Sequence, residues 1–172
     1  EALDNKKHKL KDGMCVIADK SSILGLGGII GGIKSSTELA TKNILLESAY
    51  FLPSSIRKTA RLLNINTDAK YRFERGIDPN SIQEGLEKAA ELIVKICGGE
   101  ASKYSIVGQK IQKNKIIDFE IAKYQNLIGI SISSSETDKI LSSLGFKCKK
   151  NKKNLKVEVP SWRPDVEQDV DL

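Results

Sequence analysis

The stretch DPNSIQEGLEKAAELIVKICGG, residues 78–99, carries the clearest helix signal in this 172-residue chain. Asp78 and Pro79 suit an N-cap followed by a proline in the first turn, and Gly98 with Gly99 ends the pattern. Between these ends apolar side chains recur at helical spacing, at Ile82, Leu86, Ala89, Ala90, Ile93 and Ile96. The stretch therefore predicts an amphipathic helix with one face packed against other elements.

The residues upstream predict a small mixed sheet and a second helix. Apolar, Gly-punctuated runs predict strands at residues 14–18, 23–30 and 43–51. A helix is expected from Pro53, because Ile56 and Ala60 share one face. A loop is expected over 64–69, and a short strand over 103–107 closes this half of the chain.

The residues downstream predict a compact unit of helices and a hairpin. A polar linker is expected over 108–115, and the helix expected from Ser135 has Asp138 as an acidic variant of a capping box. The other expected elements are a strand at 116–119, a helix at 121–127, and strands at 146–149 and 155–159. The fold class is therefore α+β: a mixed sheet with packed helices, followed by a small module of winged-helix type.

Composition limits the chemistry. The chain has 28 Lys and Arg against 22 Asp and Glu, a formal charge of +6. The single His8 leaves no second imidazole for a two-His metal site, and no metal site is expected. We interpret His8 as a surface residue, because it lies among lysines. Three widely spaced cysteines suit a reducing cytosol, and no membrane span or signal peptide is expected. The chain begins at Glu1 rather than Met, which suggests a piece of a longer protein.

Several features allow both a functional and a structural interpretation. The glycine cluster that includes Gly28 and Gly31 fits neither a Walker loop nor a dinucleotide fingerprint, so its spacing favours close packing. Glu47 interrupts an apolar run. The alternation of side chains there favours an exposed carboxylate over one that accepts a hydrogen bond inside a pocket. For Arg72 and Arg75, the simplest role is an ion pair with Glu74. Six lysines between 147 and 156 suit a solvated hairpin tip better than a phosphate site.

Four stretches together resemble one family. They are LGGIIGG, the long AYFLPSSIRKTARLLNINTDAKYRFERGIDP, KICGGE, and the final VPSWRPDVEQDVDL. In order and spacing they are similar to the beta subunits of bacterial phenylalanyl-tRNA synthetases. Residues 1–108 resemble the later part of the editing domain, and residues 109–172 resemble the small winged-helix-like module that follows it, truncated at its C-terminus.

The resemblance implies a role in proofreading. In this family the alpha subunit charges tRNA(Phe) with phenylalanine, using ATP and Mg²⁺, in an alpha2-beta2 heterotetramer of the cytoplasm. The editing domain hydrolyses tyrosine wrongly attached to that tRNA. By similarity, Glu47 reads the tyrosyl hydroxyl, Thr67 and Ala69 line the editing pocket, and Gly28 and Gly31 border the substrate. The resemblance thus favours a functional role for Gly28, Gly31 and Glu47, whereas the sequence pattern alone favours a structural one.

The resemblance also limits what this chain does alone. The family's editing histidine lies in a stretch upstream of the matching residues, and His8 does not match it. No catalytic residue or cofactor is therefore assigned within the chain, and the isolated chain is expected to be inactive. Two alternatives remain: a non-catalytic module that binds tRNA or subunits, and a stand-alone deacylase of mischarged tRNA.

Overall fold

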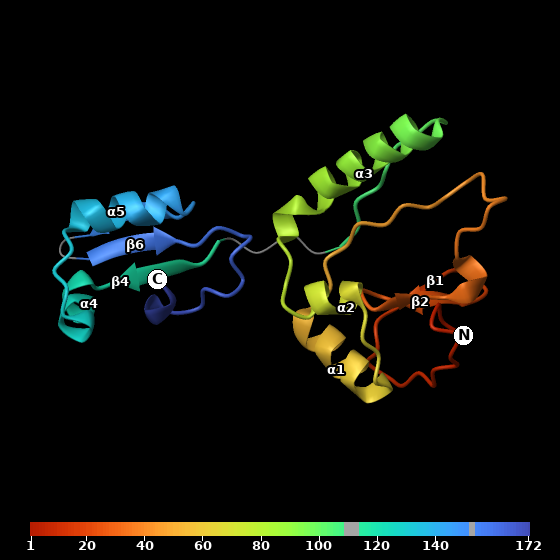
Figure 1. Cartoon of the computed structure of the whole chain (residues 1–172), viewed down its shortest axis with the longest axis horizontal. Coiled ribbons are helices and arrows are strands. Elements are labelled where there is room, and N and C mark those ends of the chain that lie inside the picture. Colours follow the sequence, from red (N-terminus) through yellow and green to blue (C-terminus); the bar gives the residue numbers. More distant parts are fainter. Residues whose placement is uncertain (109–113, 152–153) are drawn as a thin grey trace. The chain divides into compact units, whose positions relative to one another are not determined.

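The chain forms two compact units in a computed structural model that describes residues 1–108, 114–151 and 154–172. Unit 1 comprises Glu1–Ile77 and Ser81–Tyr104, and unit 2 comprises Asp78–Asn80 and Ser105–Leu172. Each unit combines a three-stranded antiparallel sheet with helices (Figure 1). The expected α+β class is therefore confirmed.

The sheet of unit 1 is built around a glycine turn. It contains β1 (Val16–Ala18), β2 (Ile23–Leu26) and β3 (Ile30–Gly31), in that order. The single strand expected at 23–30 is wrong, since the chain reverses at Gly27 and Gly28. Gly28 has a φ of +67°, a left-handed conformation that glycine adopts without steric cost.

Two helices complete the core of this sheet. Helix α1 (Pro53–Leu63) begins at the expected proline and ends at Asn64, which adopts a left-handed conformation. Helix α2 (Asp68–Phe73) occupies part of the segment expected to be a loop. The buried core joins both sides of the glycine turn to α1, through Leu26, Ile29, Ile56, Ala60 and Ile65.

The long helix signal is confirmed, with a different beginning. A 3-10 turn at Pro79–Ser81 leads into α3 (Ile82–Cys97), which ends at Gly98. None of the α3 side chains is buried in the part of the chain that the structure describes. Most of its apolar face is half-buried, while Ile96 near its end is 78% exposed.

Two of the expected strands are absent from the described residues. Residues 43–51 and 103–107 run as irregular chain. A strand needs a neighbour to pair with its main-chain groups, and neither segment has one here. A strand pattern in the sequence is therefore not sufficient without a partner strand.

Unit 2 is close to the sequence expectation. Its sheet has the order β4 (Ile116–Phe119), β6 (Asn154–Glu158) and β5 (Lys147–Asn151). Helices α4 (Ile121–Ile128) and α5 (Ser134–Ser143) accompany it. Among the described residues, the central strand supplies the two with no exposed surface, Leu155 and Val157, as expected for a strand paired on both edges.

The details of the α5 cap and the lysine cluster differ from expectation. The N-cap is Ser133, whose hydroxyl accepts from the amide of Glu136, and Asp138 plays no capping role. Lys149 and Lys156 are cross-strand partners in the sheet. Lys152 and Lys153, and residues 109–113 of the expected linker, lie outside the described residues.

Candidate functional site

Gly28 lies where the chain can accommodate no side chain. A Cβ atom at this position would lie 2.7 Å from Phe51 Cδ2 and 3.0 Å from Ile56 Cδ1. At the neighbouring Gly27, a Cβ would lie 2.8 Å from Phe51 Cε1. The group that approaches this turn closely is thus the Phe51 ring, which holds the end of the 43–51 segment against the turn.

Thr67 ties the same turn to helix α2. Its hydroxyl donates to the carbonyl of Ile29 over 2.6 Å and accepts from the amide of Lys70 over 3.1 Å. The second bond is an N-cap, which satisfies one of the free amides of the first turn. Two predicted site residues, Gly28 and Thr67, are therefore brought together through Ile29.

Ala69 lies in the first turn of α2 and not in a loop. The helix starts at Asp68, an acidic residue that suits the positive end of the helix dipole. Ala69 is half-buried and lies two residues after the Thr67 cap. A larger side chain at this position would extend from a rigid turn, not from an adaptable loop.

Glu47 offers an unpaired acceptor. Among the described residues, its carboxylate has no hydrogen bond and no ion pair. The residue is exposed, yet neighbouring atoms displace part of its water and raise the pKa of its carboxyl group. The next residue fixes the local chain, since the Ser48 hydroxyl donates to the carbonyl of Ile82 over 2.8 Å.

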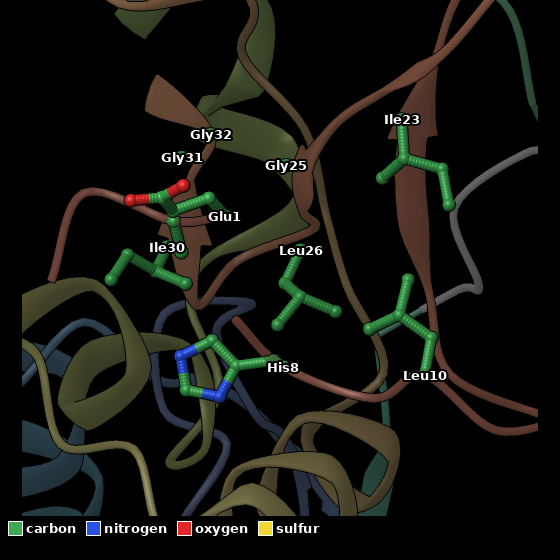
Figure 2. Close-up of a pocket in the computed structure, with 10 residues that line it drawn as sticks. Glu1, His8, Leu10, Ile23, Gly25, Leu26, Ile30, Gly31 and Gly32 are labelled. Carbon is green, nitrogen blue, oxygen red and sulfur yellow. The ribbon is translucent and has the colours of Figure 1, made fainter. Parts of the chain in front are cut away.

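Gly31 lines a separate pocket of about 190 Å³ (Figure 2). This pocket lies over the sheet of unit 1 and is also lined by His8, Gly25 and Gly32. The other four predicted site residues do not line it. A Cβ added at Gly31 would lie 3.2 Å from Leu3 Cδ1, so the Leu3 side chain packs against this glycine, and the Gly31 carbonyl accepts from the Leu3 amide over 3.0 Å.

His8 is more enclosed than its lysine-rich surroundings suggest. Only 12% of its side chain is exposed, because its Nε2 lies 2.9 Å from Asp4 Oδ2 and the ring faces the pocket. The interpretation of His8 as a surface residue is therefore wrong. A partner four residues before it, Asp4, is the signal that could have indicated this.

The arginine-rich segment at the end of α2 forms the ion pairs that the sequence suggests. Lys70 Nζ and Arg75 Nη1 lie 3.0 Å and 2.9 Å from the two carboxylate oxygens of Glu74. The guanidinium of Arg75 also covers the Tyr71 ring at 3.6 Å from its centre. Arg57 of α1 was not singled out from the sequence, and it donates to the Glu74 carbonyl over 2.9 Å.

Comparison with known families accounts for both units. Residues 1–98 match the B3/4 domain. The chain belongs to the B3/4 domain family. Residues 117–172 match the tRNA synthetase B5 domain. The B3/4 match covers the sheet of unit 1 and all of its helices, and therefore every predicted site residue.

The B3/4–B5 chain is also similar to curated proteins. It is 43% identical to a phenylalanine–tRNA ligase beta subunit of Rhodopseudomonas palustris and 41% identical to one of Mesorhizobium japonicum, each over 99% of the chain. A beta subunit of Nitrobacter winogradskyi is 38% identical over the whole chain. The chain spans 21% of the length of these relatives. The resemblance to this family is therefore confirmed.

The described part of the B3/4–B5 chain has no grouping of three His, Cys, Asp or Glu side chains suited to a metal ion. It also contains no helix that is both long and apolar enough to cross a lipid bilayer.

Proposed function

We propose that this chain is part of a phenylalanine–tRNA ligase beta subunit whose B3/4 domain hydrolyses tyrosyl-tRNA(Phe). The proposal is carried by the identity of 41–43% to beta subunits, continuous over 99% of the chain. Under it, residues 1–108 are the later part of the editing domain and residues 109–172 the following module. The whole enzyme would use ATP and Mg²⁺, pair with an alpha subunit as alpha2-beta2, and work in the cytoplasm.

The chemistry of Glu47 supports the editing role. Tyrosine differs from phenylalanine by one hydroxyl, and a pocket built for phenylalanine rejects such an isostere poorly. A carboxylate without an internal partner can accept a hydrogen bond from that hydroxyl. Glu47 is such a group, and the Ser48 bond to Ile82 fixes the chain next to it.

The other four residues would shape the substrate site. Thr67 and Ala69 come from one helix turn, and Thr67 is bonded to the chain beside Gly28. Gly31 of β3 lines the pocket of Figure 2. We assign all five residues to substrate recognition and none to the activation of water.

The test uses the full-length beta subunit that contains this chain, assembled with its alpha subunit. Glu47→Ala is expected to lower kcat/KM for tyrosyl-tRNA(Phe) hydrolysis about 10- to 100-fold, the effect of one hydrogen bond to a charged group. Ala69→Trp should block the same reaction by filling the site. Glu38→Ala, in an exposed part of the preceding loop, serves as the control.

Two outcomes would contradict the proposal, one for the residue assignments and one for the editing function. Charging with phenylalanine should continue in both variants, since neither residue belongs to the proposed synthetic site. Unchanged hydrolysis of tyrosyl-tRNA in both variants would reject the assignment of these residues. Absence of this hydrolysis in the unmodified enzyme would reject the editing function itself.

A further inference from the structure

A second cavity, of about 490 Å³, lies between α1 and the end of α2. Its apolar floor includes Ala60 and Ile65, which are 1% and 6% exposed. Its rim carries four cationic side chains, Arg57, Arg61, Lys70 and Arg75. We call this cavity with its rim the basic groove. None of the residues predicted from the sequence to form a site lines it.

The charges of the basic groove are not balanced within the described chain. Glu74 supplies the single carboxylate among its lining residues, and it is shared by Lys70 and Arg75. Arg57 bonds to a neutral carbonyl, that of Glu74. The guanidinium of Arg61 has no ion pair or hydrogen bond to a described residue. Four cations against one carboxylate make this groove a site for an anionic partner.

The geometry suits a phosphodiester. Arg57 and Arg61 are four residues apart on α1 and therefore project from the same side of the helix. Planar guanidinium groups match the oxygens of phosphate in bidentate fashion. The amides of Asn64 and Asn66, also in the lining, add neutral donors. Because the groove is open and larger than one anion, it favours a chain of phosphates over a free ion.

The basic groove adjoins the proposed editing residues through α2. Asn66, in the lining, directly precedes Thr67, and the amide of Lys70 donates to the Thr67 hydroxyl. Ala69 and Lys70 are consecutive in the same turn. A substrate whose acyl group contacts Thr67 and Ala69 would therefore place its nearest backbone phosphates close to Lys70.

We propose that the basic groove binds backbone phosphates of tRNA next to its aminoacylated 3′ end. This inference rests on the proposed editing function and assigns the polynucleotide part of that substrate. Glu74 orients the rim by holding Lys70 and Arg75 in place, while Arg57 and Arg61 supply the free charge. The apolar floor of Ala60 and Ile65 supports the α1 side of the groove.

The test compares tRNA(Phe) binding by the full-length assembled enzyme and by its Arg57→Gln/Arg61→Gln variant across a salt series. Each lost phosphate contact to a single strand lowers the slope of log K against log salt by about 0.7, so a decrease of about 1.4 is expected. The KM for tyrosyl-tRNA hydrolysis should rise about tenfold, as for loss of a charge-assisted contact. Arg61→Gln alone should show half the slope change without disturbing the Arg57 contact to α2.

Two matched variants isolate the groove from net charge. Lys88→Gln/Lys95→Gln also removes two positive charges, but from α3, and should keep the original salt slope. Arg57→Lys/Arg61→Lys keeps both positive charges and should recover most of the original salt slope. If the unmodified enzyme edits tyrosyl-tRNA but the Gln variants keep its salt slope and KM, the groove proposal is wrong while the editing function stands. If the unmodified enzyme does not bind this tRNA, both are wrong.

Discussion

The hydroxyl of Thr67 donates a 2.6 Å hydrogen bond to the main-chain carbonyl of Ile29, a residue 38 positions earlier in the chain. The same oxygen accepts from the amide of Lys70 and caps α2. One side chain thus fixes the glycine turn to the helix that carries Ala69. Because both hydrogen-bonding functions are used inside the chain, Thr67 would position the proposed substrate site as well as border it.

Thr67→Val should destabilise unit 1 by about 1–3 kcal/mol, the cost of losing a cap and leaving a main-chain acceptor unpaired. Valine keeps the size of the side chain, so the loss comes from the hydroxyl alone. Urea unfolding of the chain, followed by a signal from unit 1, measures this change.

Two further substitutions make the Thr67 result specific. Thr67→Ser keeps the hydroxyl and should stay within about 1 kcal/mol of the original chain. Thr41→Val removes a hydroxyl that accepts from Glu38 in an exposed loop, and should cost less than about 0.5 kcal/mol. Equal stabilities of the Val and Ser variants at position 67 would show that neither hydrogen bond stabilises the unit.

Gly28→Ala should destabilise unit 1 more than the same change at Gly13. The φ of +67° strains an alanine by about 1–2 kcal/mol, and its Cβ would lie 2.7 Å from Phe51. Gly13→Ala is the matched control, since Gly13 has a φ of +82° with no atom within 4 Å of the added Cβ. The excess loss at Gly28, measured by thermal unfolding of both variants, reports the packing against Phe51. Similar losses at the two positions would mean that the Phe51 ring moves away freely.

Local signals in the sequence predicted much of the fold. Pro53 and the spacing of Ile56 and Ala60 located α1, and the helix expected at 121–127 matches α4 to within one residue, because local signals act within a few residues. Helix α2 was not predicted, because six residues are too few to show an apolar period. Its signal was Thr67 followed by Asp68, a cap and an acidic first turn.

Long-range pairing could not be predicted in the same way. Residues 43–51 have the composition of a strand, but strand formation depends on a partner that no local pattern reveals. The contacts that shape the candidate site join distant residues: Thr67 to Ile29, and Ser48 to Ile82, 34 positions later. The family resemblance supplied the site residues, and only the structure showed that Thr67 is a cap and that Arg57 reaches Glu74.

Glu74 should make the stability of unit 1 sensitive to acid. The hydrogen bond from Lys70, together with the charges of Lys70 and Arg75, holds the pKa of its carboxyl below the usual value. A lowered folded-state pKa contributes stability above the unfolded-state pKa, near about 4.3, which is lost as pH falls through the folded value. Glu74→Gln should therefore be less stable than the original chain at pH 7, and the two should converge as the pH falls through the lowered folded-state pKa.

Urea unfolding at pH 7, 5 and 3 checks this, with Glu91→Gln as the control. Glu91 pairs with Lys88 at 3.7 Å, but both side chains are about 70% exposed, so the pair is weak at any pH. Its variant should follow the original chain at all three values. A Glu74→Gln deficit that stays constant from pH 7 to pH 3 would show that the carboxylate stabilises the end of α2 through its shape and not through its charge.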